Sequence, residues 1–423
     1  MQNERKEWRH IMKQIIIIGA GAAGLTAAVY AARSGADVRI LEHTDKAGKK
    51  ILSTGNGKCN ITNRFQEISC YRGNDSSFPQ KVLEQFDEND TINFMESLGI
   101  LCKEKNGYVY PRSEQASTVR EGLMMECKRL GVIIEYEVEV QEIHKKEDAF
   151  ELTAKTRRGN QIYQCDKVIL AAGSKAMPKS GSNGSGYELA KSLGLKIIKP
   201  LPALVQLKCE EGIYKEAAGV RCGANVKLMV NGELVAEEEG ELQITNYGLS
   251  GIVVMQVSRF AVKALDGRKQ VTAVIDFFSE MKREELYQKL FRMIEKFPEK
   301  TIEDILAGFI NRKLAGALLK EMGIRKDRIA SKCDESYIQG IIKCLKGYQT
   351  EVIGSNTFAE AQVCQGGVAT KEINPLTMES KKYPGLYFAG EILDVDGTCG
   401  GYNLQFAWST GAIAGTKAGE NSE

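Results

Sequence analysis

The chain has 423 residues, with 57 Lys and Arg against 55 Asp and Glu and a formal net charge of +2 at neutral pH. This length exceeds what one hydrophobic core usually holds, so two or three domains are expected. The near-neutral net charge gives no general electrostatic reason to bind nucleic acid or an anionic membrane. No apolar run is long enough to cross a bilayer. We therefore expect no nucleic-acid partner and no membrane partner.

The N-terminal residues MQNERKEWRHIM are polar and lack the apolar core of a signal peptide. Met12 is an alternative start to Met1, because the first apolar strand begins just after it. Eleven cysteines are scattered without a CxxC pair, and three histidines show no metal-ligand spacing. The sequence predicts reduced thiols, a cytoplasmic location and no metal site.

The stretch IIIIGAGAAGLTAAVYAARSGADVRILE, residues 15–42, is the most informative part of the sequence. Its four isoleucines predict a strand buried on both faces. A glycine-rich turn follows, then an alanine-rich helix from about 25 to 33 and a second strand from 38 to 41. This order is that of a βαβ unit that binds a dinucleotide.

Three glycines and one acid carry the binding function of this unit. Gly19 allows a tight turn, Gly21 lets the backbone approach a pyrophosphate, and Gly24 lets the helix pack close to the sheet. The helix N-terminus offers free N–H groups and a positive dipole end to the phosphates. Glu42 ends the second strand and is placed to accept hydrogen bonds from ribose hydroxyls.

A long segment rich in Gly, Ser, Asn and Lys follows at residues 43–63 and is expected to be a functional loop. Residues 79–130 have helical patterns around a short YVYP segment. Residues 132–140 alternate as one strand, and residues 150–156 and 161–165 are expected to form a hairpin.

A buried strand at 168–170 then ends in small residues, which let the chain pass close to a cofactor. Short alternating segments from about 203 to 275 predict a small β-domain. A charged helical pattern over about 281–348 predicts a helical insertion.

The C-terminal part returns to the cofactor pattern. GLYFAGE at residues 385–391 is a strand ending in a small residue and an acid, and Gly400-Gly401-Tyr402-Asn403 opens a final helix over about 404–417. The N-terminus of that helix offers its positive dipole end to a negatively charged cofactor group, and a plain capped helix is the alternative. Because cofactor elements stand at both ends, the cofactor domain is expected to be discontinuous.

The motifs GAGAAGL, VILAAG and GLYFAGE stand in the order found in two-dinucleotide flavoproteins. With KKILSTGNGKCNITN, PKSGSNGSGY and DVDGTCGGYNLQFAWSTG, they make the chain resemble the bacterial BaiN-like flavoproteins, also labelled aminoacetone oxidase-like FAD-binding enzymes. The resemblance covers essentially the whole chain, and GNGKCNITN and GGYNLQ are more specific than the glycine fingerprint. It implies an α/β fold in which a Rossmann-type FAD-binding domain carries an inserted β-barrel-like domain and an inserted helical domain.

The composition shifts agree with that division. The resemblance, placed on these shifts, implies an FAD-binding domain over 1–200 and 357–423, a β-barrel-like domain over 201–278 and 349–356, and a helical domain over 279–348.

The resemblance also implies which residues hold the FAD. Lys49, Lys50 and the segment 54–57 would line the ribityl chain and isoalloxazine, and Val140 would lie near adenine. The assigned residues are Gly19, Gly21, Ala22, Ala23, Gly24, Glu42, His43, Lys49, Lys50, Thr54, Gly55, Asn56, Gly57, Val140, Ala172, Gly173, Gly390, Glu391, Gly401, Tyr402, Asn403 and Leu404. The chain departs from common flavoprotein patterns in having Glu391 where most carry Asp, and Lys49 where many carry a second glycine.

The resemblance implies two reactions. One is reduction of a conjugated enone in a 3-oxo-4-ene bile acid or steroid, with NADH or NADPH as transient electron donor. The other is oxidation of a small amine such as aminoacetone with release of hydrogen peroxide. A tRNA-binding or tRNA-modifying flavoprotein is a third reading, which the charge balance disfavours.

The sequence offers few candidates for catalysis besides the cofactor. Tyr402 is either a proton donor near the flavin or a packed wall. Cys59 lies in the flavin loop, without a resolving partner nearby in the sequence. The oligomeric state stays open, and a monomer is compatible with the sequence.

Overall fold

The computed structural model describes residues 12–420, which fall into two compact units. One unit comprises the described residues up to 201 and from 363 onward, and the other comprises residues 202–362. The further separation of a helical domain from the barrel stays a prediction. No helix within the described residues is long and apolar enough to cross a membrane.

A parallel sheet with the strand order β20-β11-β1-β2-β7 forms the centre of the first unit. Its strands are β1 (Gln14–Ile18), β2 (Asp37–Glu42), β7 (Ile133–Tyr136), β11 (Lys167–Leu170) and β20 (Leu386–Phe388). The isoleucines of β1 are at most 6% exposed, because β1 is the central strand and both faces of the sheet are covered.

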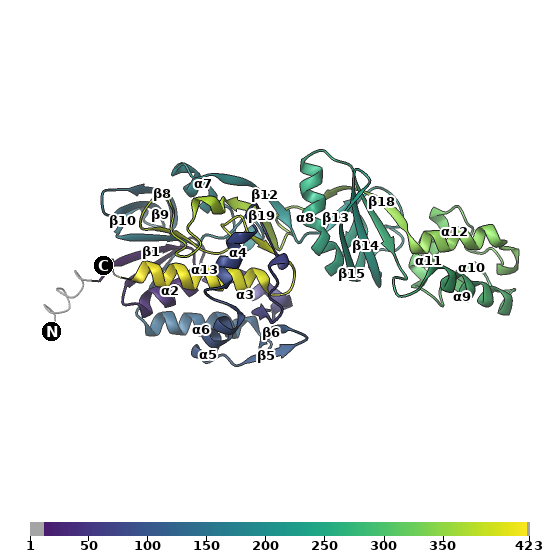
Figure 1. The fold of residues 1–423 in the computed structure, drawn as a ribbon, viewed down its shortest axis with the longest axis horizontal. Coiled ribbons are helices and arrows are strands. Elements are labelled where there is room, and N and C mark those ends of the chain that lie inside the picture. Colours follow the sequence, from purple (N-terminus) through teal and green to yellow (C-terminus); the bar gives the residue numbers. More distant parts are fainter. Residues whose placement is uncertain (1–11, 421–423) are drawn as a thin grey trace. The chain divides into compact units, whose positions relative to one another are not determined.

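Helices α2 (Ala22–Arg33) and α13 (Tyr402–Gly419) pack side by side along this sheet (Figure 1). Two glycines of α13 form the points of closest approach. A Cβ atom on Gly411 would lie 2.6 Å from the carbonyl oxygen of Ala23, and one on Gly415 would lie 2.3 Å from that of Ala27. Only glycine at these positions allows the two backbones to come so close.

Shorter elements complete the first unit. The helices are α3 (Lys49–Ser53), α4 (Ser77–Leu83), α5 (Glu88–Ser97), α6 (Ala116–Arg129) and α7 (Ser185–Ser192). The strands are β3 (Thr62–Asn63), β4 (Tyr71–Arg72), β5 (Cys102–Lys105), β6 (Tyr108–Pro111), β8 (Glu139–Lys145), β9 (Phe150–Thr156), β10 (Gly159–Cys165), β12 (Ile197–Ala203), β19 (Val363–Val368) and β21 (Asp396–Gly397).

Two local expectations for this unit were wrong. The segment expected to be a loop contains α3, a short helix that begins after left-handed Gly48. The segment 132–140 is not one strand but two, since β7 belongs to the parallel sheet and β8 to the antiparallel sheet β10-β9-β8. The break lies at Glu137, whose φ of 58° cannot continue an extended strand.

The second unit is built on a closed barrel with the strand order β13-β16-β15-β14-β17-β18. Its strands are β13 (Leu207–Cys209), β14 (Arg221–Val230), β15 (Glu233–Thr245), β16 (Gly248–Ser250), β17 (Val271–Asp276) and β18 (Tyr348–Ser355). Its helices are α8 (Ile252–Asp266), α9 (Arg283–Lys296), α10 (Ile302–Leu306), α11 (Arg312–Glu321) and α12 (Glu335–Lys346). The sequence did not predict α8, although its buried Val253, Val254, Val257 and Ala261 have helical spacing.

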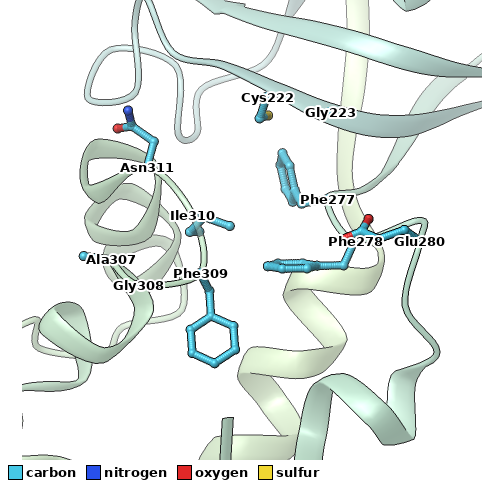
Figure 2. A pocket seen from close by; sticks show the side chains of 10 residues that line it. All are labelled: Cys222, Gly223, Phe277, Phe278, Glu280, Ala307, Gly308, Phe309, Ile310 and Asn311. Atoms are coloured by element: carbon cyan, nitrogen blue, oxygen red, sulfur yellow. The ribbon is translucent and has the colours of Figure 1, made fainter. Parts of the chain in front are cut away.

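A cavity of about 540 Å³ lies within the second unit, between the barrel and the segment that joins α10 to α11 (Figure 2). Its wall includes the rings of Phe277, Phe278 and Phe309, and none of the residues assigned to the cofactor lines it.

Candidate FAD-binding site

The carboxyl ends of β1, β11 and β20 meet at one edge of the parallel sheet, because these strands are neighbours. Gly19 follows β1 with a φ of 102°, and a Cβ atom there would lie 2.6 Å from the carbonyl oxygen of Ala171. Ala172 and left-handed Gly173 continue from β11, and Gly390 continues from β20. Ligands of open α/β sheets bind outside this edge.

The glycine turn leaves an open cradle at the N-terminus of α2. Gly21 is the N-cap residue, no side chain caps the helix, and its first turn carries no acid. Apart from the adjoining chain, no atom of the described residues lies within 4 Å of the position a Cβ atom on Gly21 would take, whereas one on Gly24 would lie 1.9 Å from the carbonyl oxygen of Gly19. The helix beginning Ala22-Ala23 therefore presents N–H groups to an unfilled space, which fits a pyrophosphate.

The Glu42 carboxylate ties the end of β2 to the glycine turn. One oxygen accepts a hydrogen bond from the Ala20 N–H at 2.8 Å, and the other accepts one from the Thr44 N–H at 2.8 Å. The His43 ring lies beside the carboxylate, with Nδ1 3.4 Å from Oε1. Each carboxylate oxygen has a second lone pair, so the acid retains capacity for ribose hydroxyls.

The segment that follows α3 turns sharply at residues assigned to the flavin. Gly55, Asn56 and Gly57 have φ angles of 55°, 54° and 82°, so three consecutive residues are left-handed. Asparagine adopts this conformation more readily than most non-glycine residues, so the Gly-Asn-Gly sequence suits the turn. Thr54 precedes this turn, and its hydroxyl donates to the carbonyl of Ile51 at 2.7 Å.

Cys59 lies at the end of this turn and is fully buried. Burial raises the pKa of its thiol to about 12. Since the thiolate is the reactive form, the structure favours a packed thiol over a redox role.

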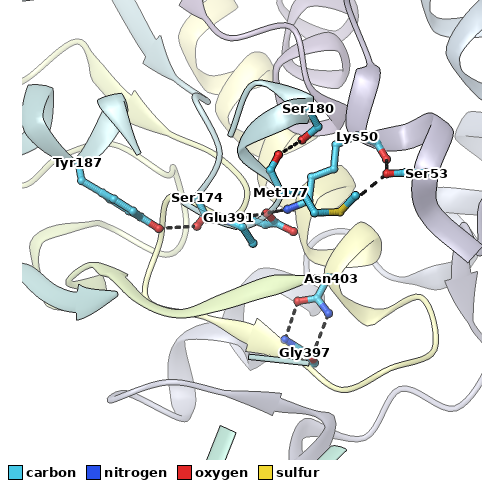
Figure 3. A network of polar contacts seen from close by, with 10 residues as sticks. Lys50, Ser53, Ser174, Met177, Ser180, Tyr187, Glu391, Gly397 and Asn403 are labelled. Carbon is cyan, nitrogen blue, oxygen red and sulfur yellow. Dashed lines mark hydrogen bonds and ion pairs between the residues drawn. The ribbon is translucent and has the colours of Figure 1, made fainter. Parts of the chain in front are cut away.

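Lys49 and Lys50 point to different partners although they are neighbours in α3. The Lys49 ammonium pairs with Asp45 at 2.5 Å, and the Lys50 ammonium pairs with Glu391 at 2.5 Å (Figure 3). The Ser174 hydroxyl donates to the same Glu391 oxygen at 3.2 Å. Ser174 was not among the residues predicted from the sequence, although it directly follows Gly173 in the VILAAGSK segment.

The N-terminus of α13 is held in place by two asparagines. The Asn403 amide accepts from the Gly397 N–H at 2.8 Å and donates to the Gly397 carbonyl at 2.9 Å (Figure 3). The Asn63 amide donates to the Gly400 carbonyl at 3.1 Å. Gly401, with φ of 98°, packs so tightly that a Cβ atom would lie 2.7 Å from the carbonyl carbon of Thr62. The first turn of α13 has no side-chain cap and no acid, so its N–H groups can face an anion.

The remaining assigned residues lie as follows. Leu404 is partly buried in the first turn of α13. Val140 is buried on β8, two residues beyond Val138, whose N–H donates to the Glu42 carbonyl at 3.0 Å. The assignment of all these residues to FAD stays a prediction.

Tyr402 is 7% exposed and packs edge-on against Tyr71, with ring centroids 5.7 Å apart. Burial, followed by the neighbouring Cys70 thiol, raises the pKa of the Tyr402 hydroxyl above its ordinary range. This environment favours the packed wall over the proton donor.

Tyr402→Phe is therefore expected to lower the rate of flavin reoxidation by substrate by far less than the roughly 10²-fold that loss of a general acid costs. The rate is measured by rapid mixing of the reduced protein with substrate, and Tyr71→Phe serves as the packing control. A loss of 10²-fold or more in Tyr402→Phe alone would assign the proton to Tyr402.

Comparison with known proteins agrees with this geometry. The family profile described as HI0933-like protein Rossmann domain matches residues 13–417. A 3-dehydro-bile acid delta(4,6)-reductase of Clostridium scindens is 43% identical over 97% of this chain and 100% of its own length. A ribosomal RNA dihydrouridine synthase of Escherichia coli is 29% identical over 93% of this chain and 95% of its own length.

Among solved structures, the 3-ketosteroid-delta4-(5alpha)-dehydrogenase of Rhodococcus jostii superposes with a TM-score of 0.51 at 17% identity, covering 97% of each chain. This likeness concerns the fold. The motif-based resemblance and the α/β fold with its inserted barrel are confirmed. The chain therefore belongs to the HI0933-like family of flavoproteins with a Rossmann-type FAD-binding fold.

Proposed function

We propose that this protein is a cytoplasmic FAD-dependent reductase that uses NADH or NADPH to saturate a carbon–carbon double bond conjugated to a ketone in a bile acid or steroid. The observation that carries the proposal is the 43% identity to the bile acid reductase, which extends over 97% of the chain. The alignment includes both compact units, so the likeness exceeds a shared cofactor fold.

Bound FAD would supply hydride transfer between the nicotinamide and the enone. The protein itself would bind the cofactor and stabilise the negative charge that the reduced flavin carries. The cradle at Gly21 and the N-terminus of α2 suit the pyrophosphate. The N-terminus of α13, fixed by Asn63 and Asn403, offers its dipole to the negative charge created by reduction.

A product assay tests this function. Incubated with NADPH or NADH and a 3-oxo-4-ene bile acid, the protein is expected to yield a product two mass units heavier, one per nicotinamide oxidised. The 3-oxo bile acid without the double bond is the control and should not be converted. Absence of the heavier product, with flavin that NAD(P)H does reduce, would exclude this substrate class.

Reduction of uridine in ribosomal RNA is a second candidate. It is favoured by the dihydrouridine synthase relatives, because the double bond of uracil is also conjugated to a carbonyl. Phe65 and Tyr108 are 67% and 41% exposed, and Tyr108 lies beside Gly400 at the start of α13. Exposed aromatic rings of this kind stack on unpaired bases.

Salt-sensitive binding of unmodified ribosomal RNA, with a gain of two mass units in one uridine, would establish that candidate over the steroid. The expectation of no nucleic-acid partner stays a prediction until this is measured.

A further inference from the structure

We propose that Lys50 is a positioning residue of the FAD site that neutralises Glu391, so that the two side chains act on cofactor affinity as one unit. This inference rests on the proposed FAD-dependent function and concerns the charge of the site rather than the reaction.

The Lys50–Glu391 pair is short and shielded. The ammonium and carboxylate are 2.5 Å apart, and their side chains are 19% and 21% exposed. Ser174, which is fully buried, donates to the same carboxylate oxygen, Oε2, at 3.2 Å. Among residues 12–420, the other oxygen of Glu391 has no hydrogen-bond partner, so it can accept from a cofactor hydroxyl.

The pair also lies where a negative charge opposes the cofactor. Gly390, immediately before Glu391, packs on the first turn of α2. A Cβ atom added to Gly390 would lie 2.8 Å from the Cβ atom of Ala23. This turn is the candidate pyrophosphate site, and an uncompensated carboxylate beside it would repel the phosphates. Lys50 removes that repulsion, whereas its neighbour Lys49 is engaged with Asp45.

A double-mutant cycle on FAD affinity tests the inference, with Kd measured on apoprotein by quenching of flavin fluorescence. Lys50→Met leaves Glu391 uncompensated and is expected to weaken binding about tenfold or more, which is about 1.4 kcal/mol. Glu391→Gln removes the repulsion and loses only part of a hydrogen bond, so its effect should be smaller. The double variant should bind FAD more tightly than Lys50→Met alone.

Lys58→Met is the matched control, because Lys58 pairs with Glu114 on the surface of the same segment, at side-chain exposures of 54% and 42%. Its FAD affinity should equal that of the wild type. If Lys50→Met unfolds, Lys50→Gln replaces it, because glutamine keeps a hydrogen-bond donor for Glu391 but loses the charge. Urea unfolding of each apoprotein separates an effect on FAD affinity from an effect on stability. A double variant that binds no tighter than the Lys50 variant overturns the inference. A wild-type protein without FAD affinity overturns the proposed function itself.

Discussion

Gly21→Val is expected to weaken FAD binding strongly and to leave the protein folded. The Cβ atom would enter a space in which no atom of residues 12–420 lies within 4 Å apart from the adjoining chain, so the apoprotein has no clash to relieve. The same space is the cradle in front of the α2 N–H groups, and a branched side chain there would separate the pyrophosphate from them. We expect affinity to fall at least about 100-fold, or about 2.7 kcal/mol.

The measurement is FAD titration of apoprotein beside urea unfolding in the absence of cofactor. Gly223→Val is the control, since Gly223 also has no atom within 4 Å of its Cβ position and lies in the barrel unit. Wild-type FAD affinity in Gly21→Val would show that the pyrophosphate lies elsewhere.

Gly415→Leu is expected to destabilise the first unit by roughly 3 kcal/mol or more, at the upper end of overpacking effects. Its Cβ atom would lie 2.3 Å from the carbonyl oxygen of Ala27, which belongs to the backbone of α2 and cannot turn away as a side chain can. The two helices would have to separate along the sheet. The N-terminus of α13 is also the candidate site that faces the flavin. FAD affinity should therefore fall together with the free energy of unfolding.

Urea unfolding followed by circular dichroism measures this effect. Lys417→Leu, on the same helix, lies in a partly exposed ion pair with Glu420 and should change stability by no more than about 0.5 kcal/mol. Equal unfolding midpoints for Gly415→Leu and the wild type would contradict the close packing of α2 on α13.

The glycine turn, α2 and Glu42 were predictable because their signals are contiguous. A run of isoleucines, three spaced glycines and an acid lie within residues 15–42, and the structure forms β1, α2 and β2 from them. Strands, turns and helices of this kind depend on residues that are close together in the sequence, so their pattern can be read from the sequence.

The polar partners of the site could not be predicted in the same way. Ser174 meets Glu391 across 217 positions, and Asn63 meets Gly400 across 337. These contacts exist only because the sheet and α13 bring distant segments together. The split between β7 and β8 was missed for a different reason, because Glu137 gives no compositional sign of its left-handed backbone.

The substrate is the least predictable feature, since relatives with the same fold are named for a bile acid and for ribosomal RNA. Both names describe reduction of a double bond conjugated to a carbonyl. In such a reaction the flavin cofactor transfers the hydride, and the protein binds and orients the reactants. The residues that select the substrate therefore need not coincide with those that bind FAD.

An anaerobic double-mixing experiment separates the proposed reductase activity from amine oxidation and from RNA modification. Oxidised protein is mixed with NADPH, NADH or aminoacetone to find which of them bleaches the flavin absorbance. The reduced protein is then mixed with a 3-oxo-4-ene bile acid, with unmodified ribosomal RNA, with aerated buffer or with anaerobic buffer. We expect bleaching by a nicotinamide, and rapid return of flavin absorbance with the bile acid but not with RNA or anaerobic buffer. Flavin that is bleached by aminoacetone but by neither nicotinamide, or that regains its absorbance with air or RNA but never with the bile acid, would contradict it.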